Sequence, residues 1–166
     1  RHRGGVVTLG TFDGLHRGHV ALLRETLAVA GRLGRPALML SFEPMPREFL
    51  SPGDPPARLT NFRERWRLLQ ASGLDALCVL RFGAALRGLR GTEFVAMLRA
   101  AMRPECLVVG HDFRFGRKGA ADTALLAAEG ERLGFAVRVL SPVLAGDERA
   151  SSSAVRAALA AGDLER

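Results

Sequence analysis

The chain has 166 residues, of which 48% are hydrophobic and 25% are charged, a balance that fits one globular α/β domain. No apolar run is long enough to cross a bilayer, and the two cysteines, Cys78 and Cys106, share no metal-binding spacing, so a membrane span and a cysteine-rich metal site are excluded. The net charge of +7 indicates an anionic partner. Because the chain lacks an arginine-rich tail and regular aromatic–basic interleaving, we expect phosphate-bearing small molecules rather than nucleic acid. Small buried thiols also fit the reducing cytoplasm, where we expect the protein to act.

Short apolar runs alternate with segments of helical periodicity along the whole chain. The runs that predict strands are Val6–Leu9, Ala37–Phe42, Ala76–Leu80, Cys106–Val109 and Ala136–Leu140. The segments that predict helices are Gly18–Leu33, Asn61–Ser72, Thr92–Met102, Thr123–Leu133 and Ser152–Ala161. This alternation predicts an α/β fold with a Rossmann-like, doubly wound parallel sheet that helices cover on both faces. Ligands of such sheets bind beyond the carboxyl ends of the strands.

The first predicted strand leads through a glycine-containing turn into the start of a helix, over Val6–His19 (VVTLGTFDGLHRGH). Backbone N–H groups of the turn and of the helix N-terminus can bind a phosphate, and Gly10 lets the backbone approach it closely. His16 and His19 are three residues apart, so both can face one phosphate from the first helical turn. The plainer alternative is that each histidine is only a surface residue near a helix start, but the glycines and the strand around the pair favour a phosphate site.

The stretch Pro44–Pro56 is rich in proline and cannot form a regular helix or a central strand. It is flanked by Phe42 and includes Phe49. We expect a long loop beside the site, which makes this stretch a candidate lid.

An acidic residue and two aromatic residues follow the fourth predicted strand, in Asp112-Phe113-Arg114-Phe115-Gly116. Such a group could hold a planar ligand ring by stacking and hydrogen bonding. Alternation places Phe113 and Phe115 on one face, so both could instead belong to the core.

Three serines, Ser151–Ser153, begin the last predicted helix and offer an N-cap and hydroxyl donors. Arg156 would project from the first turn as a fork for phosphate oxygens. The alternative is a helix that is simply well capped.

These segments resemble the motifs of one enzyme family. His16-x-Gly18-His19 after a strand marks the nucleotidyltransferase superfamily, and the longer GTFDGLHRGH resembles the FMN adenylyltransferase (FAD synthetase) domain of bacterial bifunctional riboflavin kinase/FMN adenylyltransferases. The other similar segments are Ser41–Phe49 (T-F-E-P-H-P-R-E-F in the family), Val109–Gly116 (V-G-x-D-F-x-F-G) and Ser151–Arg156 (I-S-S-T-x-x-R). Since the resemblance covers nearly the whole chain, we interpret residues 1–166 as one such domain, without the riboflavin kinase domain that normally follows it.

The resemblance implies the reaction of FMN with ATP to give FAD and pyrophosphate, by in-line attack of the FMN phosphate on the α-phosphorus. Mg²⁺ would enter with ATP and bridge triphosphate oxygens, so no dedicated metal-ligand cluster is expected. The residues expected to be catalytic are His16, His19 and Arg156. The residues expected to bind ATP are Gly10, Thr11, Phe12, Asp13, Gly14, Gly18, Gly110, Ser151, Ser152 and Ser153. The residues expected to bind FMN are Phe42, Phe49, Asp112 and Phe115.

The chain departs from the family pattern at a few positions. Met45 stands where the family usually has histidine, so a polar contact is missing from the expected flavin loop. Ala150 replaces isoleucine, Ser153 replaces threonine, and Thr11 replaces a common asparagine; these changes are mild.

Other functions remain as alternatives. Another small-molecule nucleotidyltransferase is the nearest, because His-x-Gly-His alone does not identify the second substrate; the other segments favour a flavin. A class I aminoacyl-tRNA synthetase fragment would need a lysine-rich loop, whereas Lys118 is the only lysine. A non-catalytic nucleotide sensor or RNA-binding module is disfavoured by the intact His16, His19 and Arg156.

Overall fold

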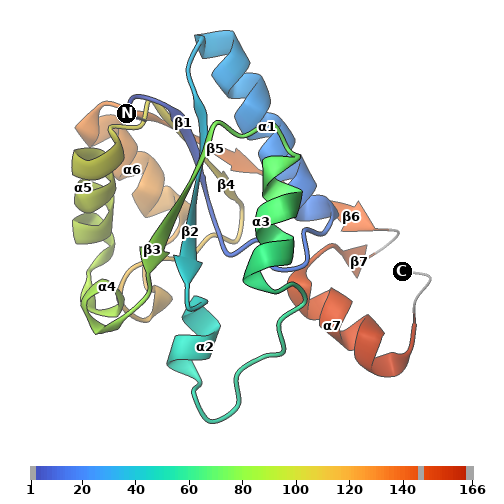
Figure 1. The fold of residues 1–166 in the computed structure, drawn as a ribbon. Helices are drawn as coiled ribbons and strands as arrows, with labels where there is room; N and C mark the ends of the chain where they lie inside the picture. The colour runs from blue at the N-terminus through green and yellow to red at the C-terminus, as the bar shows by residue number, and fades with distance from the viewer. Residues whose placement is uncertain (1–2, 146–147, 164–166) are drawn as a thin grey trace.

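A five-stranded parallel sheet forms the centre of the protein (Figure 1). The computed structural model describes residues 3–145 and 148–163. The strands of the sheet are β1 (Val6–Leu9), β2 (Ala37–Glu43), β3 (Ala76–Arg81), β4 (Cys106–Gly110) and β5 (Ala136–Leu140). Their order is β3-β2-β1-β4-β5, so the chain builds outward from β1 on one side and then on the other. This is the doubly wound arrangement predicted from the sequence, and its order reverses between β1 and β4, where a ligand site is expected.

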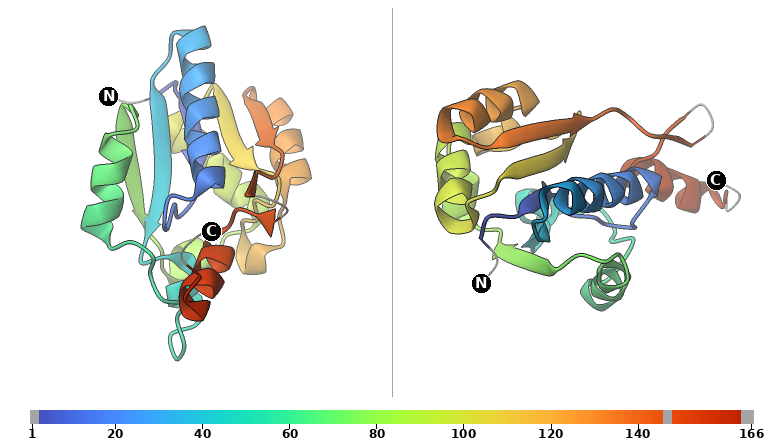
Figure 2. Two further views of the ribbon diagram at one scale, coloured as in Figure 1. Left: turned by 90° about the vertical axis from the view of Figure 1, so that its right-hand side faces the viewer. Right: turned by 90° about the horizontal axis from the view of Figure 1, so that it is seen from above.

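Helices cover both faces of the sheet (Figure 2). They are α1 (Arg17–Leu33), α2 (Pro46–Leu50), α3 (Phe62–Gln70), α4 (Ala84–Gly88), α5 (Gly91–Met102), α6 (Thr123–Leu133) and α7 (Ser152–Ala161), with a 3₁₀ turn, η1 (Arg117–Gly119). α1 and α3 lie on one face, and α5 and α6 lie on the other (Figure 1). α2 and α7 lie beyond the carboxyl edge of the sheet, and a short antiparallel pair, β6 (Leu144–Ala145) and β7 (Glu148–Arg149), precedes α7.

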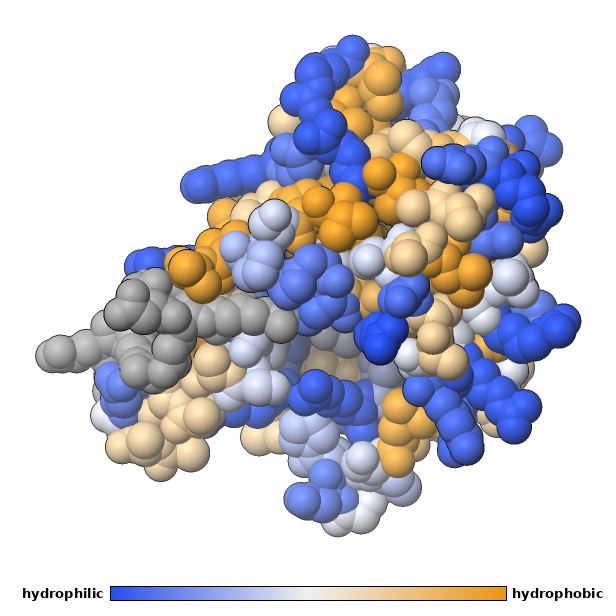
Figure 3. All heavy atoms as spheres, turned by 180° about the vertical axis from the view of Figure 1, so that it is seen from behind, coloured by the Kyte–Doolittle hydropathy of each residue, from blue (hydrophilic) through white to orange (hydrophobic). Residues whose placement is uncertain are grey.

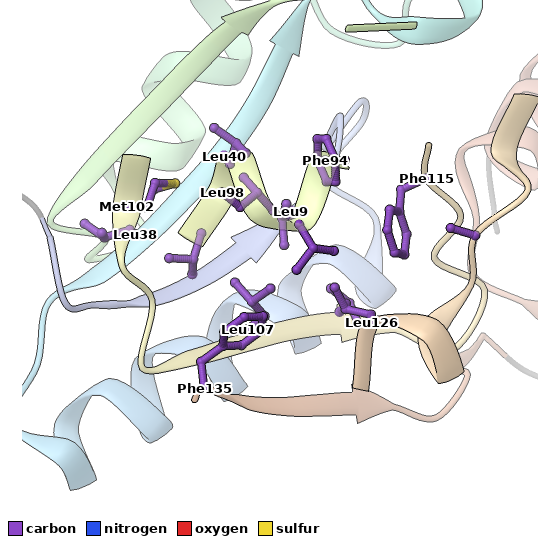
Figure 4. Packing of buried hydrophobic residues seen from close by; sticks show 14 of the residues in the cluster. Leu9, Leu38, Leu40, Phe94, Leu98, Met102, Leu107, Phe115, Leu126 and Phe135 are labelled. Carbon is purple, nitrogen blue, oxygen red and sulfur yellow. The ribbon is translucent and has the colours of Figure 1, made fainter. Parts of the chain in front are cut away.

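Burial explains why the central strands consist of nearly continuous apolar residues. Nearly all residues of β1, β2 and β4 are buried, because helices pack on both sides of them. The edge strands β3 and β5 are partly open, with Val79 39% and Val139 45% exposed. The largest core cluster lies between the sheet and the helices α5 and α6 (Figure 4).

The predicted strands and helices agree with the structure to within two residues at each end. The elements that the sequence did not predict are short: α2, α4, η1, β6 and β7. Periodicity needs a longer window than these elements offer, which is why it missed them.

The expectation that residues 44–56 contain no regular helix was wrong for the five residues of α2. Pro46 is the first residue of this helix, a position where the missing N–H group would have no partner anyway. The Glu48 side chain accepts a hydrogen bond from the Met45 backbone N–H at 2.9 Å and caps the helix start.

Candidate active site

A cavity of about 740 Å³ opens at the carboxyl ends of β1 and β4, where the strand order reverses. Most of the residues predicted from the sequence to form the site line it: Gly10, Thr11, Phe12, His16, Gly18, His19, Phe42, Gly110, Asp112, Ser151, Ser152, Ser153 and Arg156. Segments from both ends of the chain therefore meet in one place. Among the described residues, Asp13, Gly14, Phe49 and Phe115 are predicted site residues that lie outside this lining.

The turn between β1 and α1 holds three aromatic rings in a stack. The rings of His16 and His19 are parallel to within 23°, with centroids 3.7 Å apart, and Phe12 stacks on His19 at 4.7 Å. Phe12 is fully buried and, with Gly14 and Leu15, adopts a positive φ that folds the turn tightly. The buried Phe12 ring thus packs against His19 and helps to fix the histidine pair.

Close contacts leave little room for a side chain at Gly14, in the turn, and at Gly18, in the first turn of α1. A Cβ at Gly18 would lie 3.1 Å from the His16 ring and 3.3 Å from the Ala150 carbonyl. A Cβ at Gly14 would lie 2.6 Å from Leu59, and its φ of +78° also favours glycine. Gly18 leaves room for the histidine, and Gly14 leaves room for the loop that packs on the turn.

The pKa of His19 is lowered to about 3, mainly by burial and also by the neighbouring His16. Asp13 and Asp112 oppose this shift without overcoming it. His19 is therefore neutral at physiological pH and can donate one N–H group to a phosphate oxygen. A bound triphosphate would add negative charge and oppose the shift as well.

We expect the stability of the fold to decrease as the pH falls from 6.5 toward 3. In this window an unfolded His19, with its ordinary pKa of 6.5, binds a proton that the folded His19 excludes. The contribution to the unfolding free energy is at most about 1.4 kcal/mol per pH unit. Urea unfolding at a series of pH values measures the slope, and His19→Gln should flatten it; an equal slope in the variant would contradict a neutral, buried His19.

The carboxylate of Asp13 joins three separate parts of the chain. It is 1% exposed and accepts hydrogen bonds from the backbone N–H groups of Leu59 at 3.0 Å and Thr60 at 2.9 Å. It also accepts one from the Thr60 hydroxyl at 3.1 Å and one from Arg156 Nη2 at 2.7 Å. Although burial opposes them, these bonds keep the pKa of Asp13 below its usual value. Asp13 thus connects the turn between β1 and α1 to the loop at Leu59 and Thr60 and to Arg156 of α7.

Arg156 is fixed on two sides. Its Nη2 donates to Asp13, and its Nε donates to the Ala57 carbonyl at 2.6 Å. The guanidinium carries five N–H donors in a planar fork, so these bonds orient it and leave other donors for a ligand in the cavity.

Each of the three serines at the start of α7 makes a hydrogen bond, one within the helix and two to other parts of the protein. Ser151 caps the helix by accepting from the Ala154 N–H at 3.1 Å. Ser152 donates to the Asp13 carbonyl at 2.9 Å, and Ser153 accepts from Arg47 at 3.4 Å. The start of α7 is therefore attached both to the turn between β1 and α1 and to α2.

A second cavity of about 520 Å³ lies next to the first. Its walls include five phenylalanines, Phe42, Phe82, Phe94, Phe113 and Phe115. Its rim carries the basic residues Arg87, Arg114, Arg117 and Lys118. Both cavities share Phe42, Pro46, Phe113 and Arg114 as a common wall.

The predicted aromatic residues differ in their positions relative to these cavities. Phe42 lines both, and Phe115 lines only the second, where it stacks on Phe113 at 5.4 Å and is 6% exposed. Among the described lining residues Phe49 is absent from both cavities; it packs edge-on against Phe82 at 5.7 Å. Phe115 is thus both core and cavity wall, and Phe49 lies behind the wall.

A family model for FAD synthetase matches residues 1–154. The chain belongs to the FAD synthetase family. A bifunctional riboflavin kinase/FMN adenylyltransferase of Pseudomonas fluorescens is 41% identical over 165 residues, covering 99% of this chain and 53% of that protein. The protein of the same name from Escherichia coli K12 is 38% identical over 162 residues, covering 97% and 52%. The chain therefore spans about half the length of these curated relatives.

Solved structures agree with the fold of an FAD synthetase family member. A structure described as a macrolide-efflux protein from Streptococcus pneumoniae superposes with a TM-score of 0.83 and 28% identity, covering 99% of this chain and 53% of that chain. Pantothenate synthetase of Thermus thermophilus superposes with a TM-score of 0.56 at 22% identity, covering 91% and 60%, and shows the shared fold alone. In residues 3–145 and 148–163, no helix is long and apolar enough to cross a membrane.

Several cavity residues of this family member were not singled out from the sequence. Residues 141–143 and His111 line the first cavity, and Phe82 lines the second. Each follows the carboxyl end of a strand, β5, β4 and β3 respectively. The rule that ligands bind at this edge of a parallel sheet could have found them.

The surface around these cavities reflects the basic composition of the chain. Hydrophilic side chains dominate the outline of one face, and hydrophobic ones lie between them (Figure 3). The four basic residues at the rim of the second cavity place part of the net charge of +7 next to the site. This distribution favours anionic small ligands at the cavities.

Proposed function

We propose that this chain is an FMN adenylyltransferase, which converts FMN and ATP to FAD and pyrophosphate. One observation carries the proposal: a cavity lined by a histidine pair and two helix starts meets an aromatic cavity across a shared wall. The first suits a nucleoside triphosphate, and the second suits a large, flat, mostly apolar ring. The family and the printed names of the relatives support the same reaction.

In the proposed reaction, an oxygen of the FMN phosphate attacks the α-phosphorus of ATP. A new P–O bond forms, and the bond from the α-phosphorus to the bridging oxygen of pyrophosphate breaks. The attacking phosphate monoester is already ionised near neutral pH, with a second pKa of about 6, so no general base is required. Catalysis then depends on alignment and on neutralising charge at the α-phosphate and the leaving group.

Mg²⁺ would enter bound to ATP and would help neutralise the charge of the triphosphate. Among the described residues, no cluster of three or more His, Cys, Asp or Glu side chains could hold a metal ion by itself. We propose that Mg²⁺ would enter with ATP as part of the substrate.

We assign the catalytic roles to His16, His19 and Arg156. The stacked histidines would donate hydrogen bonds to oxygens of the α-phosphate, where charge develops during transfer. Arg156 would bind the β- and γ-phosphates, which leave as pyrophosphate, with its guanidinium oriented by Asp13 and Ala57.

The remaining ATP contacts are assigned to groups around the first cavity. They are Gly10, Thr11, Phe12, Gly18, Gly110, Ser151, Ser152 and Ser153. Asp13 and Gly14 would act on ATP indirectly. Asp13 orients Arg156 through a hydrogen bond, and the absence of a side chain at Gly14 lets Leu59 pack against the turn. Leu59 and Thr60 in turn depend on Asp13 for their position.

A direct test incubates the chain with MgATP and FMN and separates the products by chromatography. FAD and pyrophosphate should form in equal amounts. Parallel reactions with pantetheine phosphate, nicotinate mononucleotide and glycerol phosphate, each with ATP and with CTP, test the other nucleotidyltransferases. A nucleotidyl product from one of these, with none from FMN, would overturn the proposal, as would FMN binding without any transfer.

The flavin ring is assigned to the second cavity, with Phe42 and Phe115 as contacts and Phe49 supporting the wall. Asp112 lines only the first cavity, and we assign it to the part of FMN that reaches into that cavity toward ATP. We expect Phe115→Leu and Asp112→Ala each to weaken FMN binding about fivefold or more, because each removes ring stacking or a polar contact. ATP affinity should stay within about twofold of the parent.

Calorimetric titration of each variant with FMN and with ATP measures both affinities. Phe62→Leu is the matched control, because Phe62 is 41% exposed on α3 and lies away from both cavities. If Phe115→Leu and Asp112→Ala bind FMN as the parent does, the flavin ring lies elsewhere.

We also propose that the chain works beside a riboflavin kinase activity in the cytoplasm. The printed names of the relatives join the two activities, and phosphorylation of riboflavin yields the FMN that this reaction consumes. Both reactions use ATP, so two activities in the same compartment would draw on the same pool of ATP.

A further inference from the structure

The helix α2 forms part of both cavities, although little of its own structure stabilises it. Pro46 lines both cavities, Glu48 lines the first and Leu50 lines the second. α2 has five residues, none of which is buried, and so short a helix is not stable on its own. Contacts from outside must therefore fix its position.

Arg58, in the loop before α3, provides these contacts. Its Nε and Nη2 bind the two carboxylate oxygens of Glu48, with 2.7 Å between Nη2 and Oε2. Nη2 also donates to Glu43 at the end of β2, and the other oxygen of Glu43 accepts from the buried Arg65 at 2.8 Å. The bond to Arg58 keeps the pKa of Glu48 below its usual value, so Glu48 stays ionised. One guanidinium thus joins α2 to the sheet.

The backbone around Arg58 is itself fixed on the phosphate side of the site. The Ala57 carbonyl accepts from Arg156, and the Leu59 and Thr60 N–H groups donate to Asp13. These bonds use main-chain atoms and do not involve the Arg58 side chain. Removal of that side chain would therefore loosen α2, which would keep the hydrogen bond from Arg47 to Ser153 and the packing of Phe49 on Phe82, while leaving the attachment to Asp13 and Arg156 in place.

We propose that Arg58 is a positioning residue that holds α2 against the flavin cavity and thereby sets the affinity for FMN. The inference rests on the proposed function, because it assigns FMN to that cavity. Part of α2 also lines the first cavity, but Leu50 lines only the second, and the histidine pair and Arg156 are held by contacts outside α2. The expected effect is therefore larger on FMN than on ATP. A surface ion pair without this role would contribute little to either substrate.

The test compares Arg58→Ala, Arg58→Lys, Glu48→Gln and the double variant Arg58→Ala/Glu48→Gln by steady-state formation of FAD. We expect Arg58→Ala and Glu48→Gln each to raise the KM for FMN about tenfold, with kcat and the KM for ATP within about twofold. Arg58→Lys should fall between, because one ammonium cannot replace the planar fork. The double variant should be no worse than Arg58→Ala, since both changes break the same contact.

Arg63→Ala is the control, because Arg63 is an exposed arginine on α3 that lines neither cavity among the described residues. An unchanged KM for FMN in Arg58→Ala would overturn the inference. Equal increases in both KM values, together with a lower melting temperature, would also overturn it, because they indicate a general loss of structure.

Calorimetric binding of FMN separates this inference from the proposed function. If the parent binds FMN without forming FAD, the proposed reaction fails, and a tenfold weaker binding by Arg58→Ala still supports the positioning role. If the parent makes FAD and Arg58→Ala binds FMN equally well, the inference alone fails. A parent that does not bind FMN refutes both.

Discussion

His19→Ala should lower kcat about 100-fold or more while the KM for ATP changes much less. The imidazole is neutral, stacked between Phe12 and His16, and lines the cavity at the start of α1. In the proposed reaction, a donor held in this way would be aligned in advance with the oxygen on which charge develops, so its loss should affect the transition state more than the bound substrate. His16→Ala should act in the same direction, because removing either ring also breaks the stack.

Steady-state FAD formation with ATP and FMN varied separately measures this effect. Calorimetric titration with ATP and thermal melting of the variant show whether the cavity and the fold persist. Near-normal turnover in His19→Ala would remove both the role of His19 and the mechanism built on it.

Arg156→Lys should lower kcat/KM for ATP about 10- to 100-fold, although the charge is kept. The guanidinium binds Asp13 and the Ala57 carbonyl at the same time and still presents donors to the cavity. An ammonium has no such fork, so at least one charge-assisted hydrogen bond of about 1.5–3 kcal/mol is lost. The KM for FMN should change little.

Steady-state kinetics with each substrate varied in turn tests this expectation, with Arg63→Lys as the exposed control on α3. A defect confined to FMN would show that Arg156 does not bind the leaving phosphates. A variant that matches the parent would show that Asp13 and Ala57, rather than ATP, account for the contacts of Arg156.

The sequence predicts most of the fold because the fold depends on local patterns. β1, β2 and β4 are buried on both faces, so their residues are apolar without interruption. Gly34 and Gly134 end α1 and α6 with a left-handed conformation, and Asp122 caps the start of α6. Such signals lie within a few residues of the structure that they determine.

The histidine pair and the serines at α7 were predictable for a different reason. They follow strand ends or begin a helix, and a parallel sheet brings such positions to one edge. The prediction that these residues share one cavity therefore required no knowledge of the strand order or of side-chain contacts.

The partners of charged side chains were beyond the reach of sequence patterns. Asp13 and Arg156 are 143 positions apart, and Asp13 and Leu59 are 46 apart. The chain is rich in arginine, and the sequence does not show which arginine pairs with which carboxylate. Only the folded structure shows that Arg58 pairs with Glu48 and Arg156 with Asp13. Likewise, alternation placed Phe113 and Phe115 together but could not show that a cavity lies beside them.

α7 supplies Arg156 and the serines, yet none of its residues is buried. Polar bonds from Ser152 and Arg156 to Asp13 and Ala57 attach it to the rest of the site. An element with so little buried apolar surface detaches locally at a lower free energy than the sheet unfolds. A triphosphate that adds contacts to Arg156 would favour the attached state in proportion to its concentration. The order of the last helix is therefore expected to follow the cell's supply of ATP, while the sheet beneath it stays folded throughout.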